Sequence, residues 1–165
     1  MSITLEQLLQ SRDERVKHQK DLLGMYPGKS LLCLTVQLPG PEKRNRTSLA
    51  IAKAGVEAVR DAFKPEYEEL RDLETGYEAY FLIPLSGTEA KRTACHIEDT
   101  HPLGRLMDLD IVTPDGLVGR ECLGLAPRKC LLCDNEVRYC MRAKTHTVSE
   151  LLERIEEMVK VCCAS

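Results

Sequence analysis

Hydrophobic residues recur along this chain with two different periods, which predict a mixture of helices and strands. Three segments with apolar residues three or four positions apart predict helices, at 49–63, 88–99 and 148–162. Two near-continuous apolar runs and one alternating segment predict strands, at 30–38, 77–84 and 107–111. The fold class we expect is α+β, with a single domain over residues 1–165, a mixed or antiparallel sheet, packed helices and a Cys-rich C-terminal segment.

Capping and turn residues set the expected ends of further elements. Thr4 to Gln7 has the form of a capping box and opens a helix. Ser11 to Glu14 is a second box, so we expect a break there and a new helix up to about Leu23. The turn Thr113-Pro114-Asp115-Gly116 predicts that Leu117 to Cys122 returns as a second strand beside 107–111. The acidic segment 67–74 fits neither period and stays unassigned.

The alternating segment carries the first candidate for chemistry. Asp108 and Asp110 share one face of the predicted strand, and the apolar residues between and beside them share the other. Two such carboxylates can hold Mg²⁺ or Mn²⁺, and such ions commonly bind phosphorylated substrates. His101 and Arg105 lie just upstream on a Pro/Gly-marked turn. The alternative is an edge strand with a solvated acidic face, and for His101 a role in stabilising the turn.

Basic residues in two other places could bind an anion. Arg12 and Arg15 fall on one face of the first helix, where their guanidinium groups would suit phosphate oxygens. Lys43 lies in the loop that leaves the strand at 30–38. Ordinary solvated surface is the alternative for both places.

Cysteines near the C-terminus have the spacing of a metal site. Cys130, Cys133, Cys140 and His146 form the pattern C-x2-C-x6-C-x5-H within segment 128–146. Three thiolates and an imidazole are a tetrahedral donor set that favours zinc over magnesium or calcium. A zinc ion with no open position would be structural. Buried or free thiols are the alternative.

Composition excludes several classes of protein. The net charge of −3 argues against nucleic-acid binding through a basic field. No apolar run approaches the roughly 20 residues that span a membrane, and the N-terminus lacks the features of a signal peptide. We therefore expect a cytoplasmic protein that binds neither membrane nor nucleic acid, in which the eight cysteines are not disulfide-bonded.

Several sequence blocks together resemble one known family. They are L-L-x-S-R-D-E-R at 8–15 followed by Gln19, T-V-x-x-P-G-P-x-K at 35–43, H-P-L-G-R-L-x-D-x-D at 101–110, and P-R-x-C-L-L-C at 127–133 with Cys140 and K-T-H at 144–146. The chain resembles the citrate lyase holo-acyl-carrier-protein synthases, the apo-citrate lyase phosphoribosyl-dephospho-CoA transferases. The likeness spans nearly the whole chain, although segment 66–91 carries no recognisable block.

The resemblance implies a reaction. A phosphoribosyl-dephospho-CoA unit would pass from 2′-(5″-triphosphoribosyl)-3′-dephospho-CoA to a serine of the citrate lyase acyl carrier protein, and diphosphate would leave. It implies that Asp108 and Asp110 hold Mg²⁺ and that one of them, or a metal-bound hydroxide, helps to deprotonate the serine. It also implies that Arg105 takes developing phosphate charge and that His101 contacts the substrate or serves as the base. The residues implied to contact the phosphates are Arg12, Arg15 and Lys43.

The sequence leaves two other hypotheses about the function open. One is a zinc-stabilised interaction module without catalysis, in which the aspartates are surface residues. The other is a metal-dependent hydrolase that acts on a nucleotide.

Overall fold

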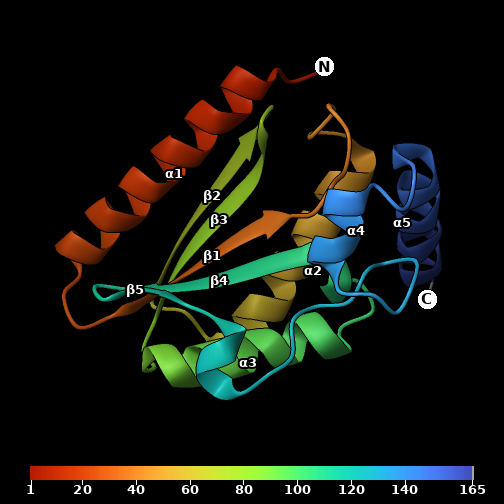
Figure 1. Cartoon of the computed structure of the whole chain (residues 1–165). Coiled ribbons are helices and arrows are strands. Elements are labelled where there is room, and N and C mark those ends of the chain that lie inside the picture. Colours follow the sequence, from red (N-terminus) through yellow and green to blue (C-terminus); the bar gives the residue numbers. More distant parts are fainter. Residues whose placement is uncertain (165) are drawn as a thin grey trace.

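A five-stranded antiparallel sheet lies between two unequal layers of helices in the computed structural model, which describes residues 1–164 (Figure 1). The strands follow the order β2-β3-β1-β4-β5, with bounds Tyr67–Leu73, Gly76–Ile83, Ser30–Val36, Met107–Thr113 and Gly116–Val118. Every neighbouring pair is antiparallel. The expected α+β class is confirmed, and of the two sheet types the antiparallel one is correct.

The two faces of the sheet are covered very differently (Figure 1). Helices α2 (Arg46–Phe63) and α3 (Gly87–Thr100) pack on one face, and α5 (Val148–Cys163) joins them through Ile155. This face holds the larger hydrophobic core, which includes Leu34, Phe81 and Leu109. The other face is covered by a single helix, α1 (Leu5–Met25), and the short helix α4 (Val137–Ala143) follows the Cys-rich loop.

The apolar contacts beneath α1 cover only part of the sheet. Leu22 and Leu23 of α1 pack on a small cluster that includes Leu31, Tyr80 and Leu82. Further along the same strands, this face presents polar side chains. Thr35 of β1 lies between Glu78 of β3 and Asp108 of β4 in the strand register. The alternation of β4 that the sequence predicted is confirmed, because its apolar residues are buried and its aspartates are only partly buried.

Two local predictions were wrong. Helix α1 runs unbroken through residue 11, because the Ser11 hydroxyl does not cap a new helix but donates to Thr75 Oγ1 at 3.1 Å. Strand β5 ends at Val118, and residues 120–123 form a 3-10 turn instead of the rest of a strand. Arg120 accounts for this change, because its guanidinium turns towards α3 and binds Glu98 at 2.8 Å. Within residues 1–164, no helix is both long and apolar enough to cross a membrane.

Because β5 is short, the edge of β4 that faces away from β1 has no strand partner beside the two aspartates, and buried side chains take that place. The Leu109 N–H donates to Glu98 Oε2 at 2.9 Å, and the Leu109 carbonyl accepts from Lys91 Nζ at 3.2 Å. Arg128 donates to the Met107 carbonyl at 2.9 Å. These contacts satisfy backbone groups that a continued β5 would have satisfied. They also fix the backbone of Leu109, the residue between Asp108 and Asp110.

Close packing beneath this strand depends on a glycine. A β-carbon at Gly104 would collide with the carbonyl oxygens of Ile97 and Glu98 at the end of α3. The carbonyl of Gly104 also accepts from Arg128 at 2.9 Å. The glycine in the H-P-L-G-R-L block therefore lets the turn before β4 lie directly on α3.

Replacing Glu98 tests this arrangement. Glu98→Ala leaves Arg120 and Arg128 without their buried carboxylate and the Leu109 N–H without an acceptor, so we expect a loss of about 3 kcal/mol or more in unfolding free energy. The matched control is Asp99→Ala, because Asp99 also contacts Arg120 but its side chain is 52% exposed. The control should lose less than about 1 kcal/mol. Equal losses in urea unfolding of the two variants would contradict the account.

Candidate active site and metal centre

A cleft of about 180 Å³ opens where the polar part of the sheet meets α1 and the loop after β1. We call it the aspartate cleft. Asp108 of β4, Arg12 and Arg15 of α1, and Lys43 of the loop all line it, as does Glu78 of β3. The structure thus brings four of the predicted site residues together from three parts of the chain. The two arginines share one face of α1 because they are spaced three residues apart.

The two aspartates differ in position and in electrostatics. Asp108 Oδ2 accepts a hydrogen bond from Gln37 Nε2 at 3.0 Å. Asp110 lies two residues further along β4, opposite Cys33 of β1. Burial raises the pKa of both carboxyls, and the negative charge of Asp108 adds to this effect at Asp110, whose pKa rises to about 6. Two partly buried carboxylates on one strand face therefore lack sufficient positive charge around them. A divalent cation would supply it, with further ligands from substrate phosphates and water.

The cations of the cleft are also incompletely balanced. Arg15 Nε is buried and makes no hydrogen bond, although Glu78 Oε1 lies 3.3 Å away. Lys43 Nζ donates to the Leu38 carbonyl at 2.7 Å, and burial together with the nearby charge of Arg12 lowers the Lys43 pKa. Positive groups that are close enough to repel one another favour an anion between them. The cleft is thus suited to phosphate groups on one side and to a divalent cation on the other.

His101 and Arg105 lie away from the aspartate cleft. His101 follows α3, and its Nδ1 accepts the Leu103 N–H at 2.9 Å, which is the turn-stabilising arrangement. Arg105 Nε donates to the Lys129 carbonyl at 2.7 Å and so ties the turn before β4 to the Cys-rich loop. Arg105 lines a second, larger cavity, which borders the cleft at Arg12 and Lys43.

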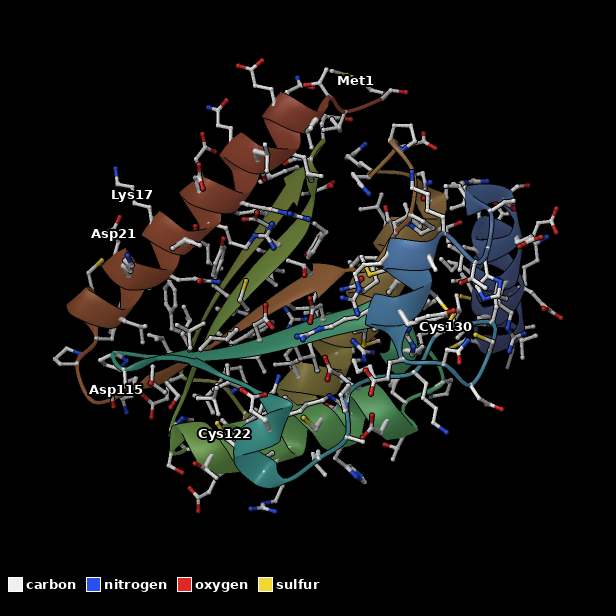
Figure 2. The ribbon with its side chains drawn as sticks, viewed as in Figure 1. Met1, Lys17, Asp21, Asp115, Cys122 and Cys130 are labelled. Carbon is white, nitrogen blue, oxygen red and sulfur yellow. The ribbon has the colours of Figure 1, made fainter. Side chains whose placement is uncertain are left out.

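The predicted metal ligands converge in space. One ligand atom from each of Cys130, Cys133, Cys140 and His146 lies within 4.8 Å of all the others, so this set could bind a metal such as zinc. Figure 2 shows Cys130 beside α4, and Cys122 well away from it beside α3. Of the residues that the structure describes, this is the one group of three or more metal-ligating side chains that it brings together.

The environment of Cys130 and His146 suits metal binding, whereas burial raises the pKa of Cys140. Burial alone would raise the pKa of Cys130, but the N–H groups of Leu132 and Cys133 and the neighbouring thiols outweigh it, and the pKa falls to about 7. A lowered pKa favours the thiolate that zinc requires. His146 Nε2 is buried and has no hydrogen-bond partner, so it is available as a ligand.

The chain path explains how four residues spread over 17 positions meet. The Lys129–Glu136 bridge and the Cys130 N–H donating to the Asn135 carbonyl at 2.7 Å close a tight loop around the first two cysteines. Cys140 then lies on α4. Lys144 ends that helix with φ of 49°, in the left-handed region, and so turns the chain back to bring His146 to the cysteines.

Several residues of the site were missed by the sequence interpretation. Gln37 contacts Asp108, Glu78 pairs with Arg15, and Lys91 and Glu98 hold β4. Glu78 did carry a signal, because a single carboxylate within the apolar run 77–84 must find a partner when that strand is buried. Lys91 and Glu98 lie on a predicted helix like many surface residues, and only the fold shows that they are buried.

Comparison with known proteins places these residues in a family context. Residues 3–161 match the family model described as apo-citrate lyase phosphoribosyl-dephospho-CoA transferase. A Vibrio cholerae serotype O1 (strain M66-2) protein named "Probable apo-citrate lyase phosphoribosyl-dephospho-CoA transferase" is 36% identical over 99% of this chain and 97% of its own length. An Escherichia coli O1:K1 / APEC protein named "Apo-citrate lyase phosphoribosyl-dephospho-CoA transferase" is 34% identical over 96% of this chain and 89% of its own length.

Metal analysis tests the Cys/His cluster. We expect near one zinc ion per chain after purification without chelator, and a loss of several kcal/mol in unfolding free energy in Cys130→Ser. Cys122→Ser is the control, because Cys122 is exposed and lies outside the cluster. Protein without zinc or another metal, and equal stability of the two serine variants, would refute the site.

The raised pKa of Asp110 gives a second prediction. A carboxyl whose pKa is higher in the folded than in the unfolded state destabilises the fold as pH rises from about 4 to about 6, and the penalty is constant above that range. Asp110→Asn removes it. In magnesium-free buffer the variant should therefore be more stable than the parent by about 1–2 kcal/mol at pH 7.5, after allowance for partial exposure, and by almost nothing at pH 4.

The matched control is Asp13→Asn on the exposed side of α1, which removes a carboxylate far from either helix end and should change the unfolding free energy by less than about 0.5 kcal/mol. Urea unfolding at the two pH values measures both variants. A less stable Asp110→Asn protein at pH 7.5 would show that the carboxylate is already well compensated.

Proposed function

The chain belongs to the apo-citrate lyase phosphoribosyl-dephospho-CoA transferase family, and on that premise we propose the reaction that it catalyses. The donor is 2′-(5″-triphosphoribosyl)-3′-dephospho-CoA, and the acceptor is a serine of the citrate lyase acyl carrier protein. The serine Oγ attacks the α-phosphorus, the bond from that phosphorus to the β-phosphate oxygen breaks, and diphosphate leaves. A phosphodiester joins the carrier to the transferred group.

The observation that supports this proposal most strongly is the arrangement around the aspartate cleft. The cationic side chains of Arg12, Arg15 and Lys43 line the same cleft as the carboxylate of Asp108. A triphosphate needs cationic side chains along its length, and its reacting phosphorus needs a divalent ion nearby. The nucleophile belongs to the carrier, which accords with the absence of a nucleophile motif from the sequence.

Asp108 and Asp110 would hold Mg²⁺ or Mn²⁺ in this proposal. When bound, the ion neutralises charge on the phosphates and aligns the α-phosphorus for attack. The same pair of carboxylates receives the serine proton. Because the two aspartates influence each other's titration, the proton belongs to the pair rather than to one of them.

The remaining predicted residues take supporting roles. Lys43 and Arg12 contact phosphate oxygens at the boundary between the two cavities. Arg15, held against Glu78, adds positive charge to the same cleft. Arg105 contributes positive charge from the larger cavity, and His101 acts through the turn that aims β4. The Cys/His cluster binds structural zinc.

A transfer assay tests the proposal. Purified protein, donor, apo carrier and Mg²⁺ should release diphosphate while the carrier gains the mass of the transferred group, and both products should require all components. Asp108→Asn and Asp110→Asn should each slow transfer by about two to three orders of magnitude, since each removes charge at the reacting phosphate. Asp115→Asn, in the exposed turn between β4 and β5 (Figure 2), should leave the rate unchanged.

Two other outcomes of the transfer assay would contradict the proposal. Diphosphate release without the carrier would identify a hydrolase instead. Full transfer activity in both aspartate variants would remove the carboxylates from the mechanism.

A further inference from the structure

The larger cavity, of about 370 Å³, lies between the Cys/His cluster and α5 and differs in character from the aspartate cleft. We call it the metal-side pocket. Much of its wall is apolar and comes from four parts of the chain, including Leu38, Leu106, Leu131, Leu151 and Ile155. Cys130, Cys140 and His146 also line it. The metal ligands therefore form one wall of the pocket as well as a folded loop.

The pocket and the cleft are neighbours that share wall residues. Arg12, Gln37, Leu38 and Lys43 line both cavities. A molecule with phosphates in the cleft would therefore have its adjoining part at the mouth of the pocket. This contact between an apolar space and a cationic one is typical of sites for nucleotides, in which a flat base is buried and phosphates meet basic side chains.

We propose that the metal-side pocket binds the adenine nucleoside of the donor. This inference rests on the proposed function, and it divides the donor between two compartments. In the donor, the triphosphoribosyl group is attached directly to this nucleoside, whereas the pantetheine arm is separated from it by a diphosphate. The nucleoside is therefore the apolar part that is nearest to phosphates lying in the cleft.

Size and charge support the same assignment. Ligand pockets range from roughly 300 to 1,000 Å³, so a pocket at the lower end of that range accepts a nucleoside but not the whole donor. Arg105 and Lys144 also line the pocket. They place positive charge near the diphosphate that leads from the nucleoside to pantetheine. The pantetheine arm would then extend out of the pocket towards solvent.

The Cys/His cluster would then have a second role, in substrate binding. Cys130 and Cys140 carry the loop and helix that form the pocket wall, and Arg105 is tied to that loop through the Lys129 carbonyl at 2.7 Å. A metal ion that holds this loop together would keep the nucleoside compartment open without touching the reacting phosphate. The cluster is in this sense a positioning element for substrate binding.

Equilibrium binding tests the proposal without requiring turnover. The probe is 3′-dephospho-CoA, which is the donor without its triphosphoribosyl group, and calorimetry measures its affinity for the full chain. Inorganic tripolyphosphate with Mg²⁺ serves as the probe of the aspartate cleft. Leu151→Trp, which fills the pocket from α5, should weaken the binding of 3′-dephospho-CoA at least tenfold and change the affinity for tripolyphosphate less than twofold.

Two further variants guard against misfolding and general surface effects. Leu151→Ala keeps an apolar side chain at this position but removes contacts between the pocket wall and the ligand. It should therefore weaken 3′-dephospho-CoA binding by a smaller factor. Glu156→Trp places the same large side chain on the exposed side of α5 and should leave both affinities unchanged. Adenosine 5′-monophosphate should compete with 3′-dephospho-CoA, and pantetheine alone should not.

Three results of the binding measurements would contradict the proposal. Unchanged 3′-dephospho-CoA affinity in Leu151→Trp, equal weakening of both probes, or competition by pantetheine alone would overturn the assignment of the pocket. Because these are binding measurements, they stand apart from the transfer assay. A protein that binds 3′-dephospho-CoA in this pocket but transfers nothing to the carrier would retain the pocket and lose the proposed function.

Discussion

The backbone of Leu109 is the point on which the candidate site depends. Its side chain is buried in the main core, its N–H and carbonyl are bound by Glu98 and Lys91, and its two neighbours are the aspartates. A strand that is held on one side by β1 and on the other by buried charged groups cannot shift without leaving those groups unpaired. The backbone that carries the two carboxylates is therefore fixed mostly by residues that do not line the aspartate cleft.

The charged side chains on this face of the sheet are in an electrostatically unfavourable environment in the protein alone. Burial disfavours the charged forms of Asp108 and Asp110, while Lys43 is destabilised as a cation by burial and by Arg12. A fold selected for stability alone would have apolar residues at such positions. A divalent ion beside the carboxylates and an anion beside the cations would offset both unfavourable groups of charges. A magnesium-bound polyphosphate supplies these two charges in one ligand, which is why the geometry favours phosphoryl chemistry.

Local sequence patterns predicted the elements well where each pattern has one structural meaning. The alternation at 107–111 and the helical spacing at 148–162 needed no long-range information, and both are confirmed. The box at Ser11 was misleading because the same residues can lie inside a helix when the hydroxyl finds Thr75 instead. Segment 67–74 was unassigned, although it forms β2, because its polar side chains are used in ion pairs such as Glu69 with His18.

The parts that the sequence could not predict are the contacts between distant segments. Strand order, the burial of Lys91 and Glu98, and the meeting of α1 with the loop after β1 all depend on how elements pack. The spacing of the cysteines was different, since four ligands within 17 residues limit their own geometry, and the predicted cluster forms. Its position beside a pocket that borders the cleft appears only in three dimensions.

The proposed reaction requires Asp108 and Asp110 to hold the divalent ion that acts on the donor triphosphate. The most direct measurement is anomalous diffraction from crystals grown with Mn²⁺ and a non-reacting analogue of the donor. We expect a manganese peak between the two carboxylates and the analogue's phosphates, with Arg12 and Lys43 on the opposite side of those phosphates. Phosphates bound elsewhere, or a manganese ion without a ligand from either aspartate, would contradict it.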